Sequence, residues 1–160
     1  MNVIPLQSGS KGNCFYVESS RTRILVDVGI TFRQASLRLQ SHDREIQSVD
    51  HIFITHDHSD HARYLLDYQK RLQVPVHLTR KTNHAIQRTS KSKTKTDTNL
   101  EHINYFSAGQ SITAGDITVH SIPTPHDASD CLAYIVENEQ QRIGILTDMG
   151  HVFVGLKQVL

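Results

Sequence analysis

The stretch ITHDHSDH, residues 54–61, decides how the rest of the chain is interpreted. It follows directly on apolar residues of HIFIT, residues 51–55, so its polar side chains come where a strand ends and a helix begins. The candidate metal ligands in it are His56, His58, Asp60 and His61. His56 and His58 are two apart in an extended segment and point the same way, so they can share one ion. Asp60 and His61, at the helix start, can turn toward a second ion.

The alternative for this stretch is a polar loop in solvent. Six residues, from His56 to His61, contain three histidines and two aspartates. Packing and solubility do not call for that concentration, whereas neutral imidazoles and carboxylates are the ligands that zinc uses. The stretch therefore predicts a metal site.

The surrounding pattern indicates alternating strands and helices. Short runs rich in branched and aromatic residues predict strands at Asn2–Leu6, Cys14–Glu18, Arg23–Val28, His51–Thr55, Val76–Leu78, Asp116–Ile122, Cys131–Glu137 and Arg142–Thr147. Apolar residues at helical spacing predict helices at Phe32–Gln40, Asp60–Gln73 and Lys81–Arg88. The alternation favours an α/β fold, with a loop over Thr89–Asn99.

The bulk composition fits one soluble domain spanning residues 1–160. The chain is 38% hydrophobic, has a formal net charge of +1 and contains eleven histidines. It has no apolar run of roughly 18–20 residues and no leader pattern, so we expect no membrane span and a cytoplasmic location. The two cysteines, Cys14 and Cys131, lie in apolar surroundings and are expected to be small buried hydrophobes rather than a disulfide.

Three further segments extend the pattern of ITHDHSDH. ILVDVG brings Asp27 to the end of a strand, PTPHDASD offers His126 after another, and ILTDMG offers Asp148 after a third. Their order and context resemble the metallo-β-lactamase superfamily, whose signature is HxHxDH. The resemblance implies a metallo-β-lactamase αββα sandwich and two divalent metal ions, zinc or manganese.

The resemblance also implies a role for each side chain. His56, His58 and His126 would bind the first ion, Asp60 and His61 the second, and Asp148 would bridge both. Asp27 would orient the ligands from beneath. A metal-bound hydroxide would be the nucleophile, and Asp60 would be the catalytic residue that orients it or accepts its proton.

The opening LQSGSKGNCFYVES, the LVDVG strand and TDMGHV resemble the YycJ/WalJ-type nuclease branch of the superfamily. That branch implies a phosphodiesterase or exonuclease acting on nucleic acid. The loop residues Ser10, Lys11, Gly12 and Asn13 could contact a phosphate, or they could simply connect two strands. The two interpretations stay open.

A basic segment supports DNA or RNA as partner. Between Tyr68 and Thr96 the chain has no Asp or Glu, and its basic residues are Lys70, Arg71, Arg80, Lys81, Arg88, Lys91, Lys93 and Lys95. Such a segment attracts polyanions, but a solvated charged face is the alternative.

Whole members of the superfamily are longer than this chain and have a last histidine ligand near their C-terminus. We therefore expect an incomplete second half and a second metal site that binds weakly or stays empty, unless His151 substitutes. An uncovered apolar face would favour a homodimer. The rival functions are hydrolysis of a small ester, thioester, lactone or cyclic phosphate, and a metal-binding fragment without activity.

Overall fold

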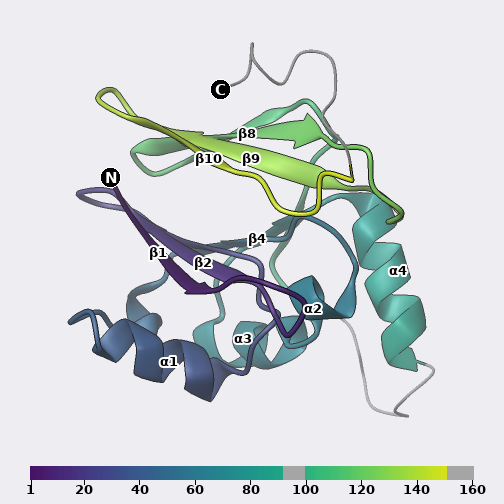
Figure 1. Cartoon of the computed structure of the whole chain (residues 1–160), viewed down its shortest axis with the longest axis horizontal. Coiled ribbons are helices and arrows are strands. Elements are labelled where there is room, and N and C mark those ends of the chain that lie inside the picture. Colours follow the sequence, from purple (N-terminus) through teal and green to yellow (C-terminus); the bar gives the residue numbers. More distant parts are fainter. Residues whose placement is uncertain (92–99, 151–160) are drawn as a thin grey trace.

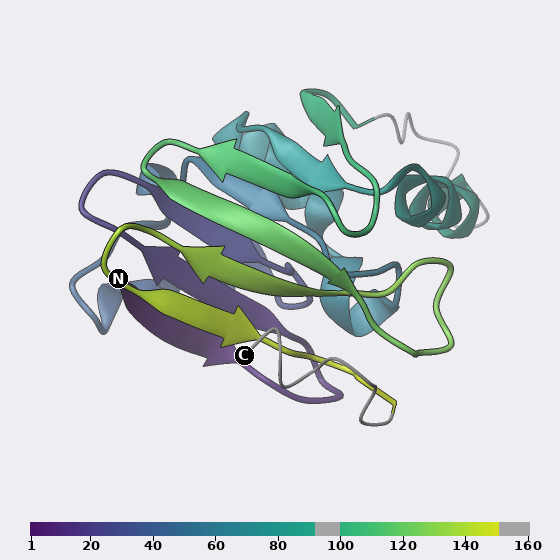
Figure 2. The ribbon, with the colours of Figure 1, turned by 90° about the horizontal axis from the view of Figure 1, so that it is seen from above.

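The computed structural model describes residues 1–91 and 100–150, and in them two β-sheets pack face to face (Figure 1). The first sheet contains, in spatial order, β1 (Asn2–Gln7), β2 (Cys14–Glu18), β3 (Arg23–Val26), β4 (His51–Phe53), β5 (Val76–Leu78) and β6 (Ile103–Tyr105). The second contains β10 (Arg142–Ile145), β9 (Leu132–Glu137), β8 (Ile117–Pro123) and β7 (Ser111–Ala114). Seen from above, the second sheet lies over the first (Figure 2).

The direction of the strands places the candidate site. β1, β2 and β3 pair antiparallel, whereas β3, β4, β5 and β6 run parallel to one another. In the second sheet all pairs are antiparallel. The loops that follow β3 and β4 therefore leave the first sheet at the same edge, where ligand sites form in open α/β sheets.

Helices cover the outer face of the first sheet (Figure 1). They are α1 (Phe32–Gln40), α2 (Ser59–Ala62) and α3 (Leu65–Leu72), while α4 (Arg80–Lys91) stands at the side of the two sheets. A 3₁₀ turn, Ile46–Ser48, precedes β4. In α1, Thr31 caps the first turn and Gln34 reaches back to the Thr31 backbone, a capping box that fixes where the helix begins.

The single helix predicted over Asp60–Gln73 is wrong, because the chain forms α2 and α3 with a break between them. The His61 carbonyl accepts a hydrogen bond from the Val28 amide, and the Tyr64 amide donates to the Val28 carbonyl. Both groups therefore pair with the chain after β3 and not with the next helical turn. These two hydrogen bonds hold α2 against the end of β3.

Two predicted strands end earlier than expected, for a related reason. The strand predicted over Arg23–Val28 ends at Val26, because Asp27 has a left-handed φ of 62°. The strand predicted over His51–Thr55 ends at Phe53, because the Thr55 amide donates to the Asp27 side chain. The strands predicted at Cys14–Glu18 and Val76–Leu78 have the bounds expected, and the bounds of the other predicted strands differ by one or two residues.

The remaining expectations have mixed outcomes. The helix predicted over Lys81–Arg88 runs from Arg80 to Lys91 in the structure, so it includes the first residues of the loop predicted over Thr89–Asn99. The rest of that loop, residues 92–99, and His151 lie outside the described part of the chain. Cys14 and Cys131 are both free and buried, as predicted. No helix in the described residues is long and apolar enough to cross a membrane.

The first sheet has a separate apolar core on each face. Toward the helices, Leu25, Ile52 and Ile54 pack against Leu39 and Leu65 among others. Toward the second sheet, a second cluster joins side chains of both sheets, and its members include Val26, Phe53, Val119, Leu132 and Tyr134. Burial of these faces is what holds the sheet edges, and hence the loops after β3 and β4, in place.

One polar contact crosses between the sheets next to these loops. The hydroxyl of Tyr134, in β9, donates to the Ile54 carbonyl at 2.7 Å, and the Tyr134 side chain is fully buried. We expect Tyr134→Phe to lower the free energy of unfolding by about 1–3 kcal/mol, because a buried carbonyl loses its partner. Urea unfolding measures the change. Tyr64→Phe is the control, since no hydrogen bond of the Tyr64 hydroxyl is found in the described structure; an equal loss in both variants would contradict the assignment.

Candidate metal centre

A buried carboxylate ties together the ends of β3 and β4. Asp27 follows β3 and has no exposed surface. Its Oδ1 accepts hydrogen bonds from the amide and the hydroxyl of Thr55, at 2.8 and 3.0 Å, and its Oδ2 accepts from the same hydroxyl at 2.8 Å. Its Oδ2 also lies 2.7 Å from Nδ1 of His61. A buried charge needs such partners, and here they orient the residues that follow.

The contact with Asp27 sets the orientation of the His61 ring. With Nδ1 donating to the carboxylate, Nε2 carries the lone pair and points to the opposite side. Burial alone would lower the pKa of His61, but the hydrogen bond and charge of Asp27, with the charges of Asp60 and Asp148, outweigh it and raise the pKa above its usual value. The same negative charges that favour a proton on the ring would favour a metal cation at Nε2 in place of that proton.

His56 is oriented by Thr55. The Thr55 hydroxyl donates to Asp27 and lies 2.9 Å from Nδ1 of His56, so it accepts from that nitrogen and leaves Nε2 with the lone pair. His56 is fully buried, and among residues 1–91 and 100–150 its Nε2 finds no hydrogen-bond partner. Burial and the neighbouring His61 lower the pKa of His56 to about 4, which keeps the ring neutral. A buried nitrogen without a partner calls for a ligand that the protein does not itself supply.

The other two histidines approach from separate loops. His58 follows β4, and His126 lies between β8 and β9. Nε2 of His126 lies 3.2 Å from Nδ1 of His58. The centroid of the His56 ring is 4.7 Å from that of His58 and 5.2 Å from that of His126. The Ser129 amide donates to Asp57, which ties the loop of His126 to the loop of His58.

Two carboxylates complete the cluster. Oδ2 of Asp148 lies 2.7 Å from Nε2 of His61 and 3.7 Å from Nε2 of His56. Oδ2 of Asp60 lies 3.4 Å from Nε2 of His61. Asp148 has a left-handed φ of 35°, and its side chain is 41% exposed, so the cluster opens to solvent on this side.

These atoms form two groups that could each hold a metal ion. Ligand atoms of His56, His58 and His126 lie within 4.8 Å of one another, and so do those of His56, His61 and Asp148. The first group is the set predicted for the first ion. The second contains the predicted bridging Asp148 and shares His56 with the first. Asp60 borders the second group at His61 without being part of it.

The loop of residues 10–13 divides into two parts. Ser10 and Lys11 are exposed, as a loop that contacts substrate would require. Gly12 and Asn13 are buried, and the side-chain nitrogen Nδ2 of Asn13 lies 3.2 Å from Oδ2 of Asp60 and 2.9 Å from Nε2 of His61. Asn13 therefore contacts the candidate ligands themselves.

Close backbone contacts hold this loop against the start of α2. The backbone amide of Asn13 donates to the backbone carbonyl of Asp60 at 2.7 Å, and the backbone amide of Gly29 donates to the backbone carbonyl of Asn13 at 2.9 Å. A Cβ on Gly29 would lie 1.7 Å from the Asp60 carbonyl oxygen, and one on Gly12 would lie 2.7 Å from the Gly29 carbonyl oxygen. Glycine is required at both positions by close approach.

A cleft of about 350 Å³ opens beside the cluster. His58 lines it together with Asp57, with Ala62 and Arg63 from the end of α2, and with Ile86 and Thr89 from α4. The exposed Arg63 is a cation close to a candidate ligand, and Ile86 supplies an apolar wall. A substrate at this cleft would reach the cluster from the α4 side.

The structure thus brings together all the predicted ligands, His56, His58, Asp60, His61, His126 and Asp148, with Asp27 beneath them. Sequence reasoning missed two contributors. The role of Thr55 had a signal, its place between the strand and His56. Asn13 was named only as a substrate-loop residue, and its contact with Asp60 and His61 depends on a packing that the sequence does not display.

The fold and the cluster have known counterparts. Residues 22–157 match the family described as the beta-lactamase superfamily domain, and the chain belongs to that family. Among solved structures it is similar to the metallo-beta-lactamase GOB-18 from Elizabethkingia meningoseptica, with a TM-score of 0.70 and 14% identity over 92% of this chain and 59% of that one. It is also similar to the Rm3 metallo-beta-lactamase, with a TM-score of 0.68 and 16% identity over 89% and 57%. The predicted metallo-β-lactamase fold is confirmed.

Sequence relatives point to the branch that the motifs resemble. The chain is 32% identical over 155 residues to the exodeoxyribonuclease YycJ of Bacillus anthracis, covering 97% of this chain and 57% of the relative. It is 34% identical over 147 residues to the exodeoxyribonuclease WalJ of Streptococcus pneumoniae serotype 2, covering 92% and 54%. The chain spans about half the length of these relatives. The predicted YycJ/WalJ branch is confirmed.

The residues fit divalent metal ions. Two groups of imidazole and carboxylate atoms lie close together and share His56, whose buried Nε2 has no hydrogen-bond partner in the part of the chain that the structure describes. Together with the fold, this donor set supports binding of a divalent metal.

The Asp27 carboxylate gives a direct test of this arrangement. We expect Asp27→Asn to weaken the binding of a divalent metal about 10–100-fold, because groups that orient metal-bound histidines have effects of this size. Competition with a chromophoric chelator measures the affinity. Asp50→Asn is the matched control, since Asp50 also accepts a backbone hydrogen bond from β3, from Arg23, but at the start of β4. Equal affinities in wild type and Asp27→Asn would contradict the role of Asp27.

Proposed function

We propose that this chain carries the metal site of a metal-dependent phosphodiesterase, acting as an exonuclease on nucleic acid. The observation that carries the proposal is the pair of ligand groups that share His56 and open on a cleft lined by His58 and Arg63. The names of the YycJ and WalJ relatives support the reaction class. Because this chain spans only about half the length of these relatives, their activity as whole proteins comes to it only as a proposal.

In this proposal two ions, zinc or manganese, are held at the cluster. His56, His58 and His126 would hold the first, Asp60 and His61 would hold the second, and Asp148 is the residue proposed to serve both. Support comes from the close approach of the first three imidazoles and from the short distance between Asp148 and His61. His56 also lies close to His61 and Asp148, so it borders the proposed ligands of both ions. The second site has fewer protein ligands and is expected to bind more weakly.

Bound divalent ions supply Lewis acidity and lower the pKa of water. The chain's own residues then position the substrate and manage protons. Asp60 is the proposed catalytic residue, because its carboxylate is partly exposed at the cluster and could accept a proton from water there. The side-chain amide of Asn13 donates to Oδ2 of Asp60 at 3.2 Å and so orients that carboxylate. Arg63 is placed to pair with a phosphate oxygen in the cleft.

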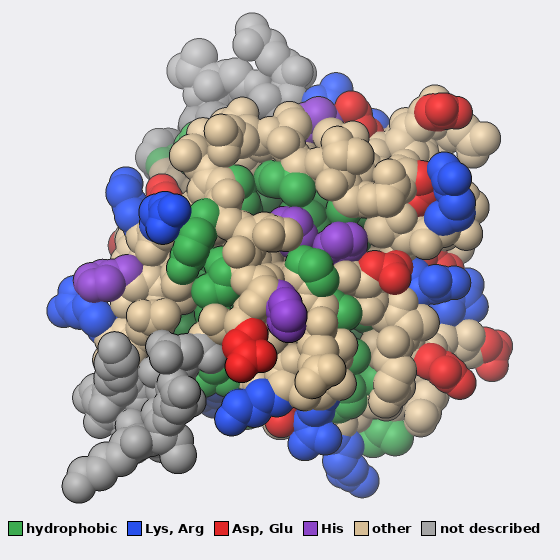
Figure 3. Space-filling view, turned by 180° about the vertical axis from the view of Figure 1, so that it is seen from behind, with side chains coloured by type: hydrophobic (Ala, Val, Ile, Leu, Met, Phe, Trp, Pro, Cys, Tyr) green, Lys and Arg blue, Asp and Glu red, His purple; other side chains and the backbone are tan. Residues whose placement is uncertain are grey.

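Nucleic acid is the proposed substrate because of charge as well as family. Helix α4 borders the cleft and has basic residues at Arg80, Lys81 and Arg88, with no acidic residue in its first turn. In Figure 3, Lys and Arg side chains lie on several sides of the molecule, so α4 supplies a local run of positive charge and not one continuous basic patch. Such a run attracts phosphate backbones, and its contribution weakens with salt. Exposed Ser10 and Lys11 could add contacts on the other side of Asp60.

Removal of one imidazole tests the proposal. We expect His58→Ala to reduce metal-dependent cleavage of single-stranded DNA by more than about 100-fold, because it removes a ligand and not merely a group that orients one. Release of labelled nucleotides with added zinc or manganese measures the rate, and RNA is assayed in parallel. His42→Ala, which removes an exposed histidine after α1, is the control.

The outcomes separate the rival functions. Cleavage of DNA or RNA that requires His58 supports the nuclease. Turnover of a small ester, thioester, lactone or cyclic phosphate, with no cleavage of either polymer, would replace it with the alternative hydrolase. Metal binding without turnover of any of these substrates would mean that this chain is only a metal-binding scaffold, and the proposal for it would be wrong.

Two finer points belong to this proposal as well. The cytoplasm is the proposed compartment, where DNA and RNA are accessible. Association into a homodimer also stays a prediction; the two exposed large apolar side chains in the described structure, Leu37 and Tyr105, lie on different elements, α1 and β6.

A further inference from the structure

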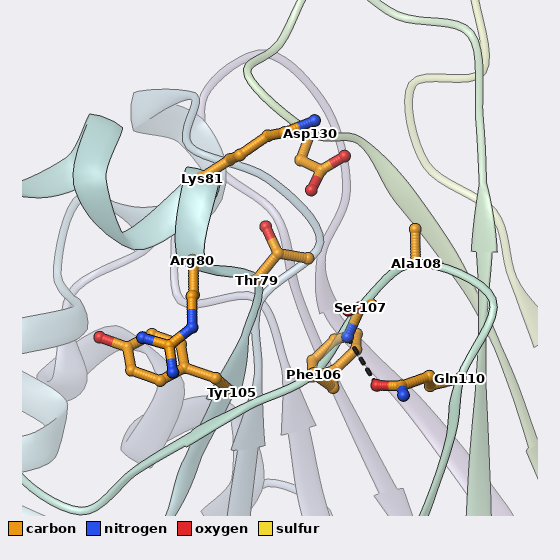
Figure 4. Close-up of a pocket in the computed structure, with 9 residues that line it drawn as sticks. All are labelled: Thr79, Arg80, Lys81, Tyr105, Phe106, Ser107, Ala108, Gln110 and Asp130. Carbon is orange, nitrogen blue, oxygen red and sulfur yellow. Dashed lines mark hydrogen bonds between the residues drawn. The ribbon is translucent and has the colours of Figure 1, made fainter.

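A second cavity, of about 500 Å³, lies where α4 begins (Figure 4). Its walls come from the start of α4, the end of β6 with the turn that follows, and the loop between β8 and β9. The lining residues used below are Thr79, Arg80, Lys81, Tyr105, Gln110 and Asp130. None of them is a candidate metal ligand, so this cavity is a site of its own.

One wall is a flat, cationic stack. The Arg80 guanidinium lies over the Tyr105 ring, 4.4 Å from its centroid (Figure 4). The Asn83 amide donates to the Tyr105 hydroxyl, which fixes the ring, and Tyr105 is 40% exposed. An arginine held flat in this way presents a planar face at little further cost in side-chain entropy. Nucleic-acid bases stack on aromatic rings and on guanidinium planes of this kind.

The charge at the cavity is suited to a phosphate beside that stack. Within residues 1–91 and 100–150, no carboxylate lies within 4 Å of the charged groups of Arg80 or Lys81. Asp130 also lines the cavity, across from Arg80, and in Figure 4 the Lys81 side chain extends toward it. Its carboxylate would repel a phosphate but accept a hydrogen bond from a base amino group, as the amide of Gln110 could. Phosphate is therefore placed on the Arg80 and Lys81 side.

This cavity is connected to the metal centre through both α4 and a loop. The Thr82 hydroxyl of α4 is 3.4 Å from the Asp130 carbonyl, and Asp130 is in the same loop as His126. Farther along α4, Ile86 and Thr89 line the cleft beside His58. From Arg80 to Ile86 the helix rises about 9 Å. One helix thus borders both the cavity and the cleft, so a single strand could contact both.

We propose that the cavity at the start of α4 binds one nucleotide of a single-stranded nucleic acid, away from the bond that is cut. The base stacks on the Arg80–Tyr105 pair, and the adjoining phosphate lies beside Lys81. The inference rests on the proposed nuclease function, because it identifies where the uncut part of the substrate is held. It predicts that Arg80 and Tyr105 contribute to affinity for a strand without contributing to metal binding.

Binding of a strand that resists cleavage tests the inference. The probe is a fluorescein-labelled phosphorothioate strand of about ten deoxythymidines, within the length range of single-strand sites, added to the metal-loaded protein and followed by anisotropy. We expect Tyr105→Ala and Arg80→Ala to weaken binding roughly 5- to 100-fold, the size of a lost base stack. Tyr105→Phe, which keeps the ring, should bind within about twofold of wild type. A ribonucleotide strand should show the same losses, because stacking and phosphate contacts are common to both polymers.

The salt dependence separates the charge from the stack. We expect Lys81→Gln to reduce the slope of log affinity against log salt concentration by about 0.7, the value for one phosphate contact on a single strand. Arg33→Gln is the matched control, because Arg33 is an exposed arginine on α1, and its slope should stay that of wild type. Thermal unfolding checks that each variant is folded; if Tyr105→Ala is not, Arg80→Gln decides.

Three results would overturn the inference. Wild-type affinity in both Arg80→Ala and Tyr105→Ala would show that the stack does not bind a base. Equal losses in Arg33→Gln would show that binding follows net charge alone. Complete displacement of the strand by an equal concentration of thymidine monophosphate would make the cavity a site for free nucleotides.

Cleavage assays keep this test apart from that of the proposed function. If no unmodified strand is cut but binding depends on Arg80, the nucleotide site stands and the nuclease proposal falls. If cleavage requires His58 while the Arg80 and Tyr105 variants bind normally, the nuclease stands and the nucleotide site falls.

Discussion

The buried carboxylate of Asp27 is the constraint on which the candidate metal centre depends. It sits in a left-handed conformation at the end of β3, has no contact with solvent, and accepts hydrogen bonds from Thr55 and His61. Without these partners a charge in this place would destabilise the fold. With them it ends two strands, fixes two imidazole rings and places the start of α2. The same group therefore serves stability and site geometry together.

The second sheet completes what Asp27 begins. Two candidate ligands, His126 and Asp148, follow β8 and β10, so they reach the cluster only because the sheets pack face to face. The Tyr134 hydroxyl and the Ile54 carbonyl join the sheets next to the loop that bears the histidines. Assembly of the ligand set thus depends on the apolar contact between the sheets. Mutations in that interface should affect metal affinity as well as stability.

The sequence was sufficient to predict the fold and to pick out the residues that the structure gathers into the candidate metal centre, because their signals are local. HDHSDH concentrates polar groups after an apolar strand, and LVDVG, PTPHDASD and TDMG repeat the arrangement in a known order. The break between α2 and α3 was not predictable in this way. It arises from hydrogen bonds to Val28, thirty-three and thirty-six residues before His61 and Tyr64, and Leu65 and Leu66 continue a helical pattern across it.

The contact of Asn13 with Asp60 and the stack of Arg80 on Tyr105 were hidden for the same reason. Each joins segments that are distant in sequence, and neither partner alone has an unusual composition. The basic segment was visible in the sequence, but only the structure shows that α4 carries part of it between a cavity and the cleft beside His58. Composition predicts a charged face, whereas packing decides what that face borders.

X-ray absorption spectroscopy of the metal-loaded chain, with elemental analysis of the same sample, tests the central claim most directly. The account predicts about two ions per chain, with imidazole nitrogen and carboxylate oxygen at about 2.0–2.2 Å. It also predicts a metal neighbour at about 3.5–4 Å. A spectrum without imidazole scattering, or with sulfur from the cysteines as a ligand, would contradict the account. A single ion with no metal neighbour would contradict the two-ion centre.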